Sequence, residues 1–173
     1  MHPLDKFTHC PVCGSSHFEK NNFKSKKCLS CGFVYYANPS AATAAFILNS
    51  RGELLVVRRG KEPAKGTLDL PGGFVDMDED AEEGMLREIE EETGLKLNSP
   101  KYLFSIPNLY EYSGMTIHTL DLFFRLDVDD NCIATAADDA AEAMWMPLSE
   151  VDETQFGLHS IRQAVKRFLN ANR

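Results

Sequence analysis

The order of apolar and polar residues predicts a mixed α and β domain over most of the chain. Residues 42–48 and 54–59 are apolar runs joined by the polar turn 49–53, which predicts a β-hairpin. Gly52 supplies the turn with flexibility. Residues 68–71 read as a short extended piece. Three further strands are expected at 101–106, 116–128 and 141–148.

Two segments have the apolar spacing of helices. In the last one, at 160–170, Ile161, Val165 and Phe168 recur at helical spacing, so the domain is expected to end in an amphipathic helix. The other follows a Gly-Gly pair at 72–73, where the backbone must bend or approach another group closely. Gly94 is expected to end this helix, which precedes the other one in the chain.

The helix between Gly73 and Gly94 is unusual because it is rich in acidic residues. Its apolar positions gather on one side, and Glu88, Glu91 and Glu92 gather on another. Carboxylates three or four residues apart on a helix repel one another. The helix therefore either presents a solvated acidic face or holds a cation among its carboxylates.

Composition and charge divide the chain into two parts. With 173 residues, 43% hydrophobic and 25% charged, it has room for one ordinary domain and a small appendage. Of the net charge of −8, the first 38 residues carry +3, from five lysines against Asp5 and Glu19, which leaves −11 for the rest. We therefore expect one module at 1–38 and a larger domain at 39–173.

The same features exclude several classes of protein. No apolar run approaches the ~20 residues of a membrane span, and the first ten residues lack the apolar core of a signal peptide. We therefore expect a cytoplasmic protein without membrane attachment. The acidic net charge argues against binding to nucleic acid through the protein as a whole, because phosphate contact needs basic surface.

Four cysteines in the first module form two C-x-x-C pairs separated by fourteen residues. This spacing matches a structural zinc site with four thiolate ligands, Cys10, Cys13, Cys28 and Cys31. Two disulfides, which a cytoplasmic setting disfavours, or free buried thiols are the alternatives. Bound zinc would stabilise a module of about forty residues, which is too small to bury a sufficient core.

The acidic helix also carries a family motif. Gly73, Glu79, Arg87-Glu88-Ile89, Glu91-Glu92 and Gly94-Leu95 fit the pattern G-x₅-E-x₇-R-E-U-x-E-E-x-G-U, with U aliphatic, at all nine specified positions. This segment resembles the signature of the Nudix hydrolases. The resemblance implies an α+β fold, the Nudix α/β/α sandwich with a mixed β-sheet, here preceded by a small zinc ribbon.

The resemblance also assigns roles to the acidic residues. Glu88 and Glu92 would be the principal ligands of Mg²⁺ or Mn²⁺, and Glu91 a further ligand. One of these carboxylates or Glu79 would help to activate water. Hydrolysis of a phosphoric anhydride suits such an ion, because hard oxygens hold it and it neutralises charge on the phosphates.

Two further parts of the motif would support this cluster. Arg87 would pair with a carboxylate, plausibly Glu79, and fix its orientation. A carbonyl of Gly72 or Gly73 would complete the coordination of the metal. The motif departs from its relatives at Asp78 and Gly84, where Gly and Ala are common, and at Leu68, where relatives often carry an aromatic residue.

The order of ribbon and signature resembles NADH and FAD pyrophosphatases. The S-Q-P-W-type element of NADH pyrophosphatases is missing, so NADH is not carried over as the substrate. We expect hydrolysis of a nucleoside diphosphate linked to another moiety, such as FAD, ADP-ribose or an NAD(H)-like compound. Hydrolysis of nucleoside triphosphates or dinucleoside polyphosphates is the alternative. A non-catalytic protein that senses nucleotides or binds nucleic acid or a partner is the alternative from another class.

Residues that bind the substrate are less well marked. Arg58 and Arg59, with Lys65, are candidates for phosphate contact by charge, and solvated surface is their alternative. Tyr112, with Tyr110 and Phe104, offers a face for stacking on a base, although core packing is the commoner use of aromatic residues. Glu142 is a candidate for an additional base, or a solvated carboxylate. The family resemblance also implies a homodimer, on which the sequence itself is silent.

Overall fold

The computed structural model describes residues 2–130, 132–138 and 140–172. It forms two compact units. One comprises the residues up to Pro39 together with Tyr110–His118, and the other comprises Ser40–Leu109 and the residues from Thr119 onward. Among the described residues, no helix combines the length and the apolar character needed to cross a membrane. The cytoplasmic location stays a prediction.

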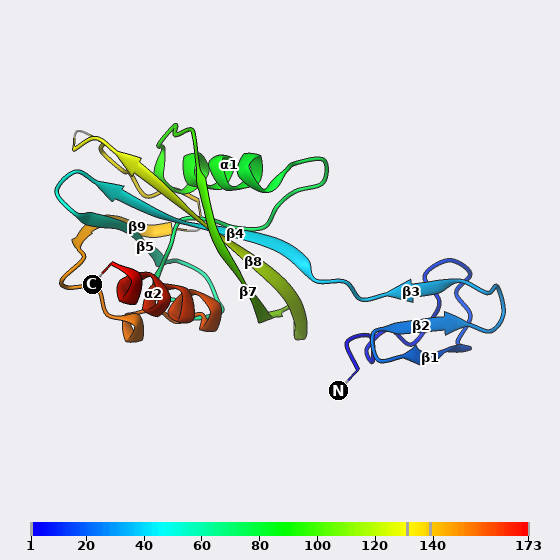
Figure 1. The fold of residues 1–173 in the computed structure, drawn as a ribbon. Helices are drawn as coiled ribbons and strands as arrows, with labels where there is room; N and C mark the ends of the chain where they lie inside the picture. Colours follow the sequence, from blue (N-terminus) through cyan, green and yellow to red (C-terminus); the bar gives the residue numbers. More distant parts are fainter. Residues whose placement is uncertain (1, 131, 139, 173) are drawn as a thin grey trace. The chain divides into compact units, whose positions relative to one another are not determined.

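The first unit is built on a small sheet whose strands were not predicted from the hydrophobic pattern. Its antiparallel strands β1 (Phe18–Asn22), β2 (Ser25–Cys28) and β3 (Val34–Tyr36) lie in the order β1-β2-β3 (Figure 1). Its buried apolar cluster consists only of Cys10, Phe18 and Cys28, with Phe33 packed against it, among the residues described. So small a core leaves most of the stabilisation to other interactions.

The second unit is built on a mixed sheet of six strands. Five lie in the order β6-β5-β4-β8-β7, and β9 pairs with β5. β4 runs parallel to β8 and antiparallel to β5. The strands are β4 (Ser40–Asn49), β5 (Glu53–Arg59), β6 (Leu68–Asp69), β7 (Lys101–Tyr112), β8 (Met115–Val128) and β9 (Ala140–Pro147).

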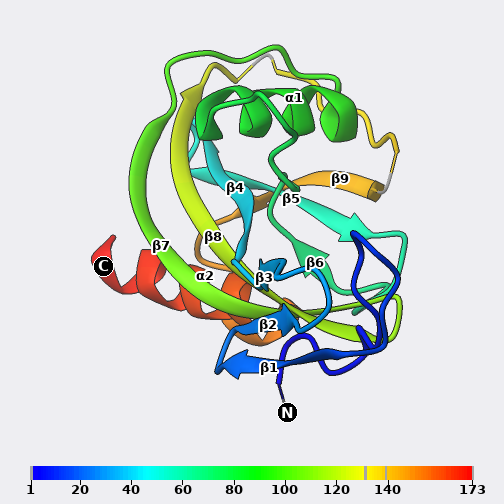
Figure 2. The same cartoon turned by 90° about the vertical axis from the view of Figure 1, so that its right-hand side faces the viewer.

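Two helices cover opposite faces of this sheet. Helix α1 (Ala81–Thr93) lies on one face and α2 (His159–Ala171) on the other, and a short 3₁₀ helix, η1 (Glu153–Gln155), precedes α2 (Figures 1 and 2). Successive residues of β4 serve the two cores, since Phe46 packs on the α2 side and Ile47 on the α1 side. The expected α/β/α sandwich with a mixed sheet is confirmed.

Most of the predicted elements are present, with one clear difference in length. The hairpin of β4 and β5, the strands β6, β8 and β9, and both helices lie where the pattern placed them. The strand expected at 101–106 continues through Pro107 to Tyr112. β7 lies at the end of the sheet order, where a proline removes no hydrogen bond between strands if its nitrogen faces away from the neighbour.

Candidate active site

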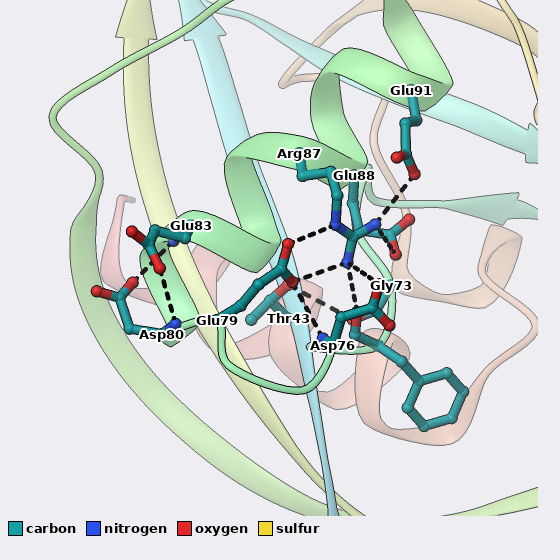
Figure 3. Close-up of polar contacts among 10 residues, drawn as sticks. Thr43, Gly73, Asp76, Glu79, Asp80, Glu83, Arg87, Glu88 and Glu91 are labelled. Carbon is teal, nitrogen blue, oxygen red and sulfur yellow. Dashed lines mark hydrogen bonds and ion pairs between the residues drawn. The ribbon is translucent and has the colours of Figure 1, made fainter.

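Helix α1 presents the acidic signature, and its ends are well defined. It begins with a capping box, in which the Asp80 carboxylate accepts a hydrogen bond from the Glu83 backbone N–H at 2.9 Å and the Glu83 carboxylate accepts one from the Asp80 N–H at 3.1 Å (Figure 3). It ends at Gly94, whose φ of 71° is left-handed. Met85 and Ile89 face the core, whereas Glu91 lies on the exposed side of the helix.

The loop before α1 is tied to strand β4. The Ala45 N–H donates to the Pro71 carbonyl at 2.9 Å, the Thr43 N–H donates to the Gly73 carbonyl at 2.8 Å, and the Val75 N–H donates to the Ala41 carbonyl at 3.1 Å. These bonds continue the sheet pattern and fix the Gly-Gly pair beside a buried strand.

Both glycines of this pair are needed for close approach. A Cβ at Gly72 would lie 2.2 Å from the Thr43 carbonyl oxygen, and φ there is 148°, a value that other residues rarely adopt. A Cβ at Gly73 would lie 2.4 Å from Cδ of Glu88. The Glu88 carboxylate therefore occupies the space that any side chain at position 73 would fill.

Glu92 lies one turn further along the helix and is buried beneath the same loop. It is 9% exposed, and its carboxylate accepts a hydrogen bond from the Gly72 N–H at 3.1 Å. Burial, together with the nearby charges of Asp69 and Glu88, raises the pKa of Glu92 to about 8 against the effect of the hydrogen bond from Gly72. Burial likewise raises the pKa of Glu88, against the effect of its bond to Arg87.

Arg87 lies at the centre of the acidic cluster (Figure 3). Its Nε and Nη2 donate to the two oxygens of Glu79 at 2.7 and 3.0 Å, and Nη2 also donates to the Phe74 carbonyl at 3.0 Å. Its Nη1 donates to Glu88 and to Glu91, each at 3.0 Å. The pairing of Arg87 with Glu79 that the resemblance implies is thus present, and this hydrogen bond lowers the pKa of Glu79.

The carboxylates expected to bind metal are near one another but are held by different partners. Glu88 and Glu91 contact Arg87, whereas Glu92 contacts the loop. In the part of the chain that is described, only cysteines bring three or more candidate donor atoms within 4.8 Å of one another. The donor set nevertheless fits Mg²⁺ or Mn²⁺, because its ligands are hard oxygens and Gly73 leaves room for the Glu88 carboxylate.

Most of the residues proposed to contact the substrate pair with other side chains, and of them Arg59 is close enough to Glu92 to lower its pKa. Arg58 on β5 and Glu142 on β9 face each other across the sheet and form an ion pair of 2.9 Å. Arg59 donates to the Asp69 carboxylate at 2.5 Å. Tyr112 is 59% exposed and belongs to the residues of the first unit. Their roles in substrate binding stay predictions.

Asp69 is a buried residue of this region that the sequence reading missed. It lies between two buried leucines, three positions before Gly72, and its carboxylate also accepts a hydrogen bond from the Leu70 N–H at 2.9 Å. Burial raises its pKa against the effect of Arg59. An acidic residue inside an apolar run next to the Gly-Gly pair was the available signal.

The four cysteines of the first unit come together as their spacing predicts. Their Sγ atoms all lie within 4.8 Å of one another, with 3.7 Å between Cys10 and Cys31 and 3.6 Å between Cys13 and Cys28. Tetrahedral zinc with Zn–S bonds of about 2.3 Å places sulfurs about 3.8 Å apart. The backbone N–H of Cys31 lowers the pKa of the Cys28 thiol to about 6, which favours the thiolate that a metal needs. The arrangement fits zinc.

Comparison with known proteins gives concordant results over most of the chain. Residues 38–168 match the family described as NUDIX domain. The ADP-ribose pyrophosphatase of Methanocaldococcus jannaschii is 34% identical over 137 residues, which make up 78% of this chain and 78% of that protein. The NAD-capped RNA hydrolase NudC of Deinococcus radiodurans is 30% identical over 149 residues, which make up 83% of this chain but 50% of that protein.

Solved structures give the same result for the fold. The crystal structure of a NUDIX hydrolase from Nitrosomonas europaea superposes with a TM-score of 0.72 and covers 94% of this chain and 90% of that one. Its sequence identity is 18%, so this likeness concerns the architecture alone.

Proposed function

Because this chain belongs to the NUDIX domain family, we propose that it hydrolyses the pyrophosphate bond of ADP-ribose or of a closely related conjugate such as an NAD-like dinucleotide. It is a Nudix hydrolase, and its relatives include a named ADP-ribose pyrophosphatase and named NAD-capped RNA hydrolases. The substrates in these names share an adenosine diphosphate joined to a second ribose. The chain spans about half the length of the NudC relative, so the substrate of that protein is not transferred as a whole.

One observation carries the proposal, namely the contact of two helix carboxylates with the Gly-Gly loop. Glu88 fills the space at Gly73, and Glu92 accepts the Gly72 N–H. Glu88, Glu92 and Glu91 would hold Mg²⁺ or Mn²⁺ with a loop carbonyl. When bound, the ion would neutralise charge on the diphosphate. The Gly73 carbonyl already accepts the Thr43 N–H, which favours Gly72 as the carbonyl ligand.

Orienting the attacking water and accepting its proton would fall to different carboxylates of the cluster. Glu79 is held by Arg87 and by the Asp76 N–H at 3.0 Å, and these bonds lower its pKa, so it suits an orienting role. Glu88 and Glu92 have raised pKa values and suit the role of proton acceptor better. Attack of water on one phosphorus would release AMP and, from ADP-ribose, ribose 5-phosphate.

The proposal assigns a structural zinc ribbon to residues 1–38, which lie within the first unit, and the catalytic domain to residues 39–173. The sulfur spacing supports zinc in this module. The homodimer implied by the family resemblance stays a prediction that light scattering of the purified chain would test.

Product analysis tests the proposed function. The purified chain is incubated with Mg²⁺ or Mn²⁺ and with ADP-ribose, NADH, FAD and ATP in separate reactions, and the products are identified by mass. We expect AMP and ribose 5-phosphate from ADP-ribose. E92Q is expected to lose turnover while retaining part of its affinity for ADP-ribose.

Other products would point to other functions. Inorganic pyrophosphate from ATP, with ADP-ribose left intact, would favour the cleansing of nucleoside triphosphates. Full activity of both E91Q and E92Q would contradict the assigned roles. Binding of ADP-ribose without any turnover by the wild type would favour a sensor.

A further inference from the structure

The guanidinium of Arg87 is fully occupied, and its donors divide into two groups. An arginine has five N–H donors. Nε and Nη2 bind Glu79 through both of its oxygens and reach the Phe74 carbonyl, so this edge joins two groups of the preceding loop. The two hydrogens of Nη1 reach Glu88 and Glu91 instead. One edge is bidentate and the other end is shared between two separate carboxylates.

The shared end contacts residues that the proposed function assigns to the metal. Glu88 and Glu91 would both be ligands of the divalent ion, and each accepts from Nη1 at 3.0 Å. Glu91 is the more exposed of the pair, with 46% of its side chain exposed against 18% for Glu88. A carboxylate oxygen that binds a divalent ion gives up most of its capacity to accept from a guanidinium, and two cations at one carboxylate repel.

We propose that the Nη1 end of Arg87 competes with the divalent ion for Glu91 and Glu88, while the opposite edge keeps Glu79 in place. Arg87 thus weakens the binding of metal at the same time as it positions Glu79. This inference rests on the proposed function, because it takes the acidic helix as the metal site. Arg87 is then a positioning residue that lowers the affinity for metal. A residue that only organised the carboxylates would raise this affinity.

The sign of this effect separates the two roles. If Arg87 only organised the carboxylates, its removal would spread them and weaken metal binding. If Nη1 competes with the ion, removal frees Glu88 and Glu91 and takes a positive charge from the site, so metal binds more tightly. A charge-assisted hydrogen bond contributes enough free energy to change affinity by about tenfold.

Direct binding of Mn²⁺ measures this sign. Free Mn²⁺ is titrated by electron paramagnetic resonance against wild type, R87Q and R51Q, without substrate, and circular dichroism verifies that each variant is folded. R51Q is the matched control, because Arg51 pairs with Glu53 in the β4–β5 turn at 2.8 Å and is 51% exposed. We expect R87Q to bind Mn²⁺ about tenfold more tightly and to hydrolyse ADP-ribose more slowly, with R51Q unchanged in both. Equal or weaker binding by folded R87Q would overturn the proposal.

A measurement on the wild type keeps the test independent of how R87Q folds. Nitrogen-15 spectra of arginine side chains are recorded as Mg²⁺ is added. We expect the Nε hydrogen of Arg87 to remain protected from exchange, while its Nη1 hydrogens lose protection. Unchanged Nη1 exchange at saturating Mg²⁺ would contradict the inference, and hydrolysis of ADP-ribose by the same sample would show that the proposed function still stands.

Discussion

At the scale of single residues, the two glycines of the loop serve different purposes. Gly72 is set against backbone, since a Cβ there would meet the Thr43 carbonyl at 2.2 Å, whereas Gly73 is set against a side chain that the proposed chemistry uses. Their substitution should therefore separate stability from activity. A substitution at one glycine also serves as the control for the same substitution at the other.

We expect G72A to lose stability and G73A to lose activity. G72A should lower the free energy of unfolding by about 2–3 kcal/mol, because the backbone must shift and φ is unfavourable. G73A should lower kcat about 100-fold with a smaller loss of stability, because the added methyl group would displace the Glu88 carboxylate. Urea denaturation and steady-state kinetics with ADP-ribose measure both quantities. A stable G73A with normal kcat would contradict the assigned position of Glu88.

Glu92 should make stability depend on pH when Mg²⁺ and Mn²⁺ are absent. Its pKa is about 8 in the folded chain against an ordinary 4.5, so the folded state keeps the proton to higher pH than the unfolded chain does. Its contribution is therefore fully present below the ordinary value and is lost as pH rises towards 8. The loss amounts to a few kcal/mol.

Thermal denaturation between about pH 5 and pH 8 measures this dependence. The midpoint should fall as pH rises in buffer freed of divalent ions, and added Mg²⁺ should restore it at the upper end. E92Q should have a flatter profile, because it has no proton to lose. An identical slope in wild type and E92Q would assign the dependence to other groups.

The sequence allowed the acidic residues and the pairing of Arg87 with Glu79 to be predicted, but not the other contacts of these residues. The spacing of the signature placed Glu88, Glu91 and Glu92 on one side of a helix, and the family resemblance singled out Glu88 and Glu92 among them. The sequence did not disclose that Arg58 pairs with Glu142, 84 positions away, since that contact depends on how β5 and β9 pair. Gly84 appeared to be a costly departure from Ala. In the structure, a Cβ at this position would lie 3.0 Å from the Glu79 carboxylate, which gives the glycine a reason.

At the scale of elements, Asp121 joins β7, β8 and α2. Its buried carboxylate accepts hydrogen bonds from Asn108 at 3.2 Å, Thr119 at 2.6 Å and Ser160 at 2.5 Å. Ser160 lies in the first turn of α2, whose N-cap residue Leu158 provides no side-chain cap. A carboxylate near a helix N-terminus is also favourable for the helix dipole. Asp121 therefore ties the first turn of α2 to the neighbouring strands through the Ser160 hydroxyl.

We expect D121A to destabilise the chain by about 3 kcal/mol, because three buried donors lose their acceptor. The stability of D121N should lie between that of the wild type and that of D121A. Its amide keeps one acceptor oxygen, but its NH₂ group would face side chains that also donate. Urea denaturation gives the order. A loss under about 1 kcal/mol for D121A would show that water or other groups replace the carboxylate.

Elements with strong periodicity were predictable, and those fixed by their surroundings were not. Helix α2 and strands β4 and β5 follow from their apolar spacing. Strand β7 was expected to end before Pro107, but its place at the end of the sheet order tolerates the proline. Strands β1, β2 and β3 are five residues long or shorter and show no alternation of apolar and polar residues, so they give little sequence signal.

At the scale of the whole molecule, the two units differ in how they can be stabilised. The second has two apolar clusters on opposite faces of its sheet, whereas the apolar cluster of the first consists of Cys10, Phe18 and Cys28 among its described residues, with Phe33 against them. The +3 charge of the first 38 residues adds repulsion among lysines when the metal is absent. The first unit should therefore depend on zinc, and the second should not.

Loss of zinc should thus unfold one unit and spare the other. We expect one zinc per chain by elemental analysis of the wild type, and its loss in C13S, because three thiolates leave the tetrahedral site incomplete. In amide spectra of the full chain, signals of β1 to β3 should collapse to unfolded positions while those of α1 and α2 remain. C132S is the matched control, since Cys132 lies outside the cluster and packs beside the α1 core. Zinc retained in C13S, or α1 and α2 lost along with the strands, would contradict the division of stability argued from the two cores.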